Sequence, residues 1–180
     1  MLVSKMNDIT TYDDFFSRSD YAKILGIVSE PRWRWGHGSK NVRRSHPGYN
    51  SRGFPFWRID LDKESYFTND LLNIIQERTQ QEYNLFDVYA NGHTFGTMGD
   101  FHRDWNDETG RTFLLYVNNG WSIDWGGHTI FDLGDGKYHY HLPRPNSATF
   151  FPGIIPHMAE ATSRKFGGLR VTIAWKLLLK

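Results

Sequence analysis

The chain has 180 residues, a formal net charge of +1 and no cysteine. Hydrophobic residues make up 39% and aromatic residues 16%, which is typical of a folded protein with a substantial core and argues against disorder. The absence of cysteine excludes disulfides, thiolate metal sites and cysteine nucleophiles, and it favours a reducing, cytoplasmic location. We expect neither a secretory leader nor a membrane span, because no apolar run reaches the required length.

The first 83 residues predict a mixture of helices and strands. Threonines that can cap and early acids favour a short helix over Thr10–Ser17, and the apolar Ala22–Val28 fits a helix or a strand. Phe54–Leu61 predicts a strand, which Pro55 places near a sheet edge. From Ser65 to Gln81, apolar residues at helical spacing predict a helix that packs against a sheet.

A basic segment lies inside this N-terminal part. It contains no Asp or Glu from Pro31 to Arg58 but seven basic residues, namely Arg32, Arg34, Lys40, Arg43, Arg44, Arg52 and Arg58. Its first residues, Arg32–Trp35, alternate as in a half-buried strand, and Gly36–Gly53 indicates a long loop. Three interpretations stay open: a solvated loop with its tryptophans in the core, a lid over a site, or a nucleic-acid surface on which tryptophans stack bases.

The rest of the chain predicts a series of short strands separated by glycine-rich turns. This pattern favours a β-sandwich, barrel or jelly roll within one domain of residues 1–180. The expected strands are Leu85–Ala90, Gly99–Trp105, Thr112–Asn118, His128–Asp132, Tyr138–Leu142, Ala148–Phe151, His157–Thr162 and Leu169–Leu178.

His102 and Asp104 are the first candidate metal ligands. Side chains two apart on a strand project to the same face, so an imidazole and a carboxylate would lie side by side. His157 is the best candidate for a third ligand, and two histidines with one carboxylate are characteristic of non-haem Fe(II) oxygenases. His139 and His141 form a rival pair at the same spacing, but no carboxylate near them completes a site.

Arg170 opens an apolar, partly β-branched run that predicts a buried strand. A buried guanidinium needs an anion, and its planar fork suits a carboxylate. Lys176, farther along the same strand, is a weaker alternative for this role. His93 and His128 are interpreted as pocket or loop residues, with a supporting role beside a metal site open to His93.

These motifs resemble those of a known family, the 2-oxoglutarate- and Fe(II)-dependent dioxygenases, and within it the prolyl 4-hydroxylase-like branch. The resemblance covers about residues 84–178. The residues that carry it are His102-Arg103-Asp104, Phe113–Asn118, Trp125–Phe131, Pro143–Pro152, Pro156-His157 and Arg170–Trp175.

The resemblance implies a mainly β fold, the double-stranded β-helix or jelly roll, with supporting N-terminal helices in residues 1–83. It implies His102, Asp104 and His157 as ligands of Fe(II), and Arg170 as partner of the distal carboxylate of 2-oxoglutarate. Tyr116 and Tyr89 match positions where tyrosines bind that cosubstrate, although core packing is an equal interpretation of Tyr116. O₂ is the second cosubstrate, and ascorbate is an additional cofactor of such enzymes.

The family implies hydroxylation of a C–H bond. The carboxylate of Asp104 favours this over halogenation, because halogenating members lack it. Peptidyl proline is the substrate suggested by analogy. The alternatives are a free amino acid or other small metabolite, a nucleic acid oxidised with help from the basic segment, and a non-catalytic jelly-roll binding module.

Overall fold

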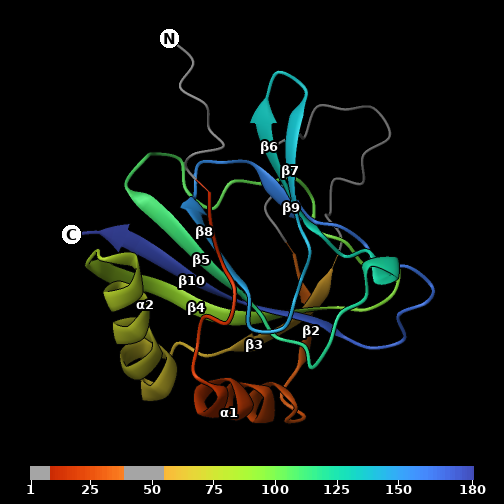
Figure 1. The fold of residues 1–180 in the computed structure, drawn as a ribbon, viewed down its shortest axis with the longest axis horizontal. Helices are drawn as coiled ribbons and strands as arrows, with labels where there is room; N and C mark the ends of the chain where they lie inside the picture. Colours follow the sequence, from red (N-terminus) through yellow and green to blue (C-terminus); the bar gives the residue numbers. More distant parts are fainter. Residues whose placement is uncertain (1–8, 39–54) are drawn as a thin grey trace.

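The computed structural model describes residues 9–38 and 55–180, which form two antiparallel sheets (Figure 1). The larger has the strand order β1-β8-β5-β10-β4-β3-β2 and the smaller the order β7-β6-β9. The strands are β1 (Thr10–Tyr12), β2 (Arg34–His37), β3 (Phe56–Asp60), β4 (Tyr83–His93), β5 (Gly110–Tyr116), β6 (Thr129–Gly134), β7 (Lys137–His141), β8 (Ala148–Pro152), β9 (His157–Ala159) and β10 (Arg170–Leu179).

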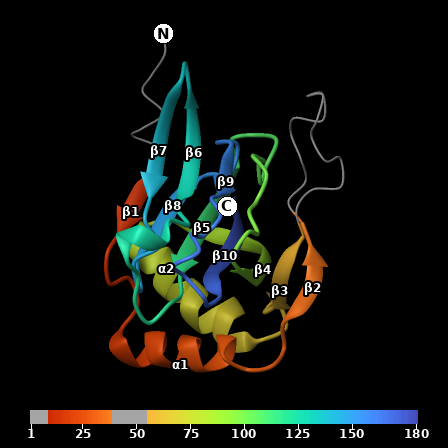
Figure 2. The ribbon, with the colours of Figure 1, turned by 90° about the vertical axis from the view of Figure 1, so that its right-hand side faces the viewer.

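Two α-helices pack on one side of the larger sheet, and the smaller sheet lies on the other (Figures 1 and 2). The helices are α1 (Arg18–Val28) and α2 (Leu71–Thr79); a π-helical turn, Tyr66–Asp70, leads into α2. Helix α1 begins at Ser17, whose side chain accepts a hydrogen bond from the Asp20 N–H. No helix of the described residues is long and apolar enough to cross a membrane.

Strand β10 separates two cores because its side chains alternate between the two faces of the sheet. Val171, Ile173, Trp175 and Leu177 belong to the larger hydrophobic cluster, which also contains residues of both helices. Arg170, Thr172, Ala174 and Lys176 point the other way and line a cavity. The inner wall of that cavity is therefore built from every second residue of the central strands.

The structure confirms most of the expected elements and corrects others. Residues Thr10–Tyr12 form strand β1, paired with β8, so the prediction of a helix over Thr10–Ser17 was wrong. The prediction missed this pairing because β8 lies far away in the sequence. Ala22–Val28 is helical as part of α1. Strand β3 lies next to the edge strand β2, which agrees with the prediction that it lies near an edge.

The expected strand Gly99–Trp105 is absent from the described structure, apart from one isolated bridge between His102 and His157. Strand β2 is more exposed than the half-buried strand predicted there, and Trp35 is 51% exposed. Most of the expected loop Gly36–Gly53 lies outside the described residues.

Trp175 is the largest fully buried side chain, and its indole N–H donates to the carbonyl of Phe67 at 3.0 Å. We expect Trp175→Ala to lower the free energy of unfolding by about 3–5 kcal/mol, because it leaves a cavity in the larger cluster. Chemical denaturation measures this. Trp35→Ala, at an exposed site, is the control and should cost less than about 1 kcal/mol; equal losses would contradict the assignment of the core.

Candidate metal centre

A cavity of about 290 Å³ lies on the inner face of the larger sheet. Strand β4 lines it with Asp87, Tyr89, Asn91 and His93. Strand β10 lines it with Arg170, Thr172, Ala174 and Lys176. Strand β9 contributes His157, and the irregular segment before β5 contributes His102 and Asp104. The three predicted metal ligands and Arg170 thus line one cavity.

His102, Asp104 and His157 are the only group of three potential metal-ligating side chains found in residues 9–38 and 55–180. One ligand atom of each lies within 4.8 Å of the other two. The Nε2 atoms of His102 and His157 each lie 3.4 Å from a different carboxylate oxygen of Asp104. Ligands about 2.1 Å from one ion at right angles would lie about 3 Å apart, so this spacing fits a single ion.

Backbone carbonyls orient both imidazoles. The Nδ1 atom of His102 lies 2.8 Å from the carbonyl oxygen of Asp100, and that of His157 lies 2.9 Å from the carbonyl oxygen of Ile155. Each Nδ1–H therefore donates to a carbonyl, which leaves the Nε2 lone pair directed at the site. Burial lowers the pKa of His157 to about 3, which keeps that imidazole neutral and able to bind a cation.

The Asp104 side chain is 4% exposed, and its Oδ2 atom contacts two other polar side chains. Thr112 donates to this oxygen at 2.6 Å, and the Lys176 ammonium forms an ion pair with it. Burial alone would raise the pKa of Asp104, but Lys176 and the histidines hold it well below its ordinary value. The carboxylate is therefore ionised at neutral pH, as a hard cation requires.

Backbone contacts replace the strand that the sequence predicted here. His102 and His157 exchange two backbone hydrogen bonds of 3.0 and 2.9 Å, and the Asp104 N–H donates to the Gly153 carbonyl at 2.9 Å. The Trp105 ring lies so close to Gly110 and Gly153 that a Cβ atom at either glycine would overlap it. These contacts bring His102 and Asp104 together without regular strand alternation.

The donor set fits Fe(II). Two neutral imidazoles and one carboxylate bind from one side, which leaves the remaining positions of an octahedral ion for exchangeable ligands. The cavity supplies space for such ligands next to the three side chains.

Arg170 is 1% exposed and lies at the far end of the cavity wall. Its Nε donates to the Gly127 carbonyl at 2.6 Å, and its Nη2 donates to Thr129 Oγ1 at 3.0 Å. Burial lowers its pKa to about 10, so it stays charged at neutral pH. Within the described residues no carboxylate forms an ion pair with it, which marks it as a site for an external anion.

The two predicted tyrosines lie in different places. Tyr116 is fully buried, its ring centroid is 5.9 Å from the Arg170 guanidinium carbon, and its hydroxyl is 3.4 Å from Thr149 Oγ1. Tyr89 pairs with Ala174, whereas His93 pairs directly with Arg170. The structure therefore places Tyr89 nearer to Lys176, and His93 occupies the position beside Arg170.

Among the inner residues of β4, Tyr89 and His93 were expected near the site, whereas Asp87 and Asn91 were not. Both ring nitrogens of His93 and the Oδ1 atom of Asn91 are buried without a hydrogen-bond partner. Lys176 also faces the cavity, although it was considered only as an alternative to Arg170. The two-residue period of strands β4 and β10 could have revealed all of them.

The rival pair lies elsewhere. His141 stacks on Tyr116 with a ring-centroid distance of 4.6 Å and lies 3.1 Å from Ser147 Oγ, while His139 packs on Phe131. Neither belongs to a group of three potential ligands in the described part of the chain. Both have structural contacts that account for their positions.

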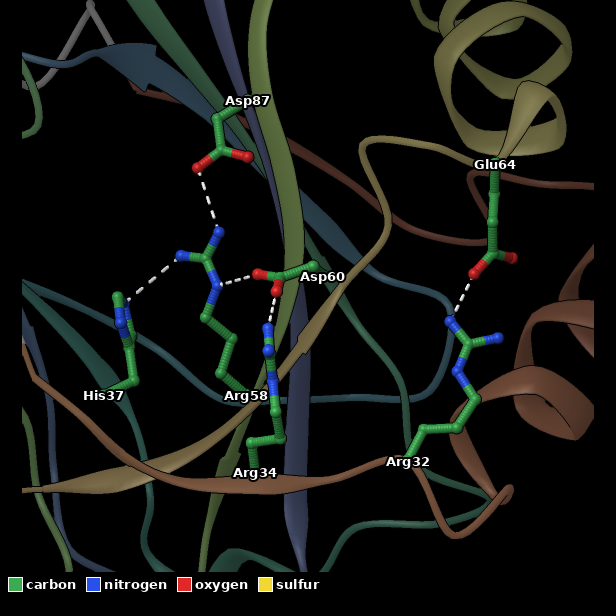
Figure 3. A network of polar contacts seen from close by, with 7 residues as sticks. All are labelled: Arg32, Arg34, His37, Arg58, Asp60, Glu64 and Asp87. Carbon is green, nitrogen blue, oxygen red and sulfur yellow. Dashed lines mark hydrogen bonds and ion pairs between the residues drawn. The ribbon is translucent and has the colours of Figure 1, made fainter.

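Three arginines of the basic segment pair with acidic residues outside it (Figure 3). Arg32 pairs with Glu64, Arg34 pairs with Asp60, and Arg58 bridges Asp60 and Asp87. These pairs reduce the charge that three of the seven basic residues would offer to phosphates. The remaining basic residues of the segment lie outside the described residues.

No family model and no curated protein matches the chain. Solved structures do match, and they define the class by fold: the jelly roll of the 2-oxoglutarate- and Fe(II)-dependent oxygenases. This confirms the predicted fold class.

The similar structures include a prolyl 4-hydroxylase of Pseudomonas putida, with a TM-score of 0.62, 16% identity and coverage of 100% of both chains. A 2OG-Fe(II) oxygenase-family oxidoreductase of Burkholderia pseudomallei has a TM-score of 0.70 and 10% identity over 96% of this chain and 85% of its own. A Trichoplax adhaerens prolyl hydroxylase, in complex with a hypoxia inducible factor peptide fragment, has a TM-score of 0.66 and 16% identity over 99% and 87%.

We expect the protein to bind one Co(II) ion, measured by calorimetry on metal-free protein. Asp104→Ala and His157→Ala should each weaken binding by about 100-fold or more, because even residues that only support ligands contribute 10–100-fold. His139→Ala, in the rival pair, should leave the affinity unchanged. A large loss of metal affinity in this control would show that the ion binds at β7 instead.

Acid should destabilise the metal-free protein because histidines buried as neutral groups resist protonation. Burial lowers the pKa of His93 to about 3 and that of His141 to about 4, well below the ordinary value of 6.5. As pH falls from about 6.5 to about 4, the unfolded chain binds protons that the folded chain does not, so stability falls.

Each such histidine contributes up to about 1.4 kcal/mol per pH unit in this window. We expect His141→Gln to make the pH dependence shallower, as measured by urea unfolding at several pH values with a chelator present. An unchanged slope would show that His141 accepts a proton in the folded state.

Proposed function

We propose that the protein is an Fe(II)- and 2-oxoglutarate-dependent dioxygenase that hydroxylates a C–H bond. The observation that carries the proposal is one cavity lined by a two-histidine, one-carboxylate cluster and by a buried arginine without an acidic partner. The fold shared with oxygenases supports it. When bound, iron would supply the coupling of 2-oxoglutarate decarboxylation by O₂, which gives succinate and CO₂, to formation of the oxidant for the substrate.

The protein's own residues hold and orient these groups. His102, Asp104 and His157 would bind the ion, and Arg170 would grip the distal carboxylate of 2-oxoglutarate through its free guanidinium N–H. Tyr116 and Arg170 are both almost fully buried, and the Tyr116 ring lies beside the guanidinium. Exclusion of water strengthens each charged contact and protects the oxidant from side reactions.

Two substrate classes have support. A peptidyl proline is suggested by the prolyl hydroxylases of the same fold, one of which was solved with a peptide fragment. A small metabolite is favoured by the cavity, whose volume of about 290 Å³ is at the small end for ligand sites and must also hold 2-oxoglutarate. Oxidation of nucleic acid has less support, since arginines of the basic segment are paired with acids.

Release of succinate from 2-oxoglutarate with added Fe(II) tests the proposal. The wild-type protein should form succinate, and Asp104→Ala should form none. A non-catalytic jelly-roll module would form none in either case, and this result would overturn the proposal.

We expect Arg170→Gln to raise the KM for 2-oxoglutarate by about tenfold or more, because it removes a charge-assisted hydrogen bond worth about 1.5–3 kcal/mol. Steady-state succinate formation at varied 2-oxoglutarate measures this. The matched control is Arg164→Gln, since Arg164 is exposed and packs near Phe95. Equal KM values for Arg170→Gln and wild type would remove Arg170 from the cosubstrate site.

A further inference from the structure

Lys176 gives the cavity a second buried cation. Its side chain is 11% exposed and projects from β10 to the same face as Arg170. Six residues separate the two, or about 20 Å along the strand, so one cosubstrate carboxylate cannot serve both. The Lys176 ammonium contacts Asp104 and lies 5.8 Å from the Tyr89 ring centroid.

The other charged residues near Lys176 neutralise one another. Arg58 bonds Asp60 and Asp87, and Arg34 pairs with Asp60, so this network of two arginines and two aspartates has no net charge (Figure 3). Arg103 also lines the cavity, but it is exposed, so water screens its charge.

Among the other groups that line the cavity, the charges do not balance when metal and cosubstrate are bound. A divalent ion, Lys176 and Arg170 carry four positive charges, whereas Asp104 and the 2-oxoglutarate dianion carry three negative charges. One positive charge is left among side chains that are themselves buried, where an unpaired charge is costly. Asp104 cannot neutralise both the ion and Lys176, so the Lys176 ammonium is the group left without a counter-charge.

Polar side chains of β4, in the cavity wall between Arg170 and Lys176, also lack hydrogen-bond partners. Asn91 and His93 project from β4 into the cavity, and the Asn91 Oδ1 atom and both His93 ring nitrogens are buried without a hydrogen bond. The ligands that fill the cavity must therefore be polar as well as anionic.

We propose that the substrate is a small carboxylic acid with a net negative charge, whose carboxylate binds Lys176 beside the metal. This rests on the proposed function and selects between its two substrate classes. A proline inside a peptide has no carboxylate to offer Lys176. The Tyr89 ring, with the Arg58 guanidinium carbon 3.8 Å from its centroid, forms the wall next to the ammonium.

Matched pairs of ligands test this. The probes are small aliphatic carboxylic acids and their primary amides, which differ in the one negative charge. The protein is loaded with saturating Zn(II) and 2-oxoglutarate, so that no turnover occurs, and binding is measured by calorimetry and by the shift in melting temperature. We expect at least one acid to bind about tenfold or more tightly than its amide.

Lys176→Met should remove the preference for that acid, and Lys176→Arg should retain most of it because the charge remains. Lys137→Met, at an exposed position of β7, is the control and should keep the preference. Melting curves of each loaded variant report whether it is folded, and the acid-to-amide comparison in the wild type needs no variant.

The proposal is overturned if no acid binds better than its amide, or if Lys176→Met keeps the preference of the wild type. Succinate assays separate these results from failure of the proposed function. Wild-type protein that forms succinate but shows no acid preference contradicts only the role of Lys176. Wild-type protein that forms no succinate contradicts the dioxygenase itself.

Discussion

The two-residue period of β10 is the constraint on which the rest of the structure depends. Odd-numbered residues such as Trp175 pack under the helices, while Arg170 and Lys176 face the cavity. A shift of one residue would put both cations into the hydrophobic cluster and its large apolar residues into the site. Pairing with β4 on one side and β5 on the other fixes the register. Core packing and site chemistry are thus specified by the same strand.

Buried charge connects the core to the function. Asp104 is ionised because Lys176 and Thr112 support one of its oxygens, and the same ionisation suits it to a cation. Arg170 satisfies only part of its hydrogen-bonding capacity within the protein. Each of these incompletely paired charges matches one ligand of the proposed reaction. Asp104 matches the ion, Arg170 the cosubstrate and Lys176 the substrate.

Short strands and glycine turns are local patterns, and they sufficed to predict a mainly β domain. The resemblance to a known family was needed to choose the jelly roll and to associate His102 and Asp104 with the distant His157 and Arg170. The sequence was not sufficient to predict how His102 and Asp104 meet, since a bridge to β9 and contacts to Gly153 replace the expected strand. The position of Tyr89 could not be predicted from the sequence either, because the register between β4 and β10 is a long-range property. Strand β1 escaped prediction for the same reason.

The packing of Trp105 against Gly110 and Gly153 has an evolutionary consequence. These two glycines set the depth at which the indole rests, and the adjoining Asp104 follows it. Substitutions there would alter the spacing of the ligands while leaving their identity intact. Selection could therefore adjust how strongly the ion is retained through positions that never touch it.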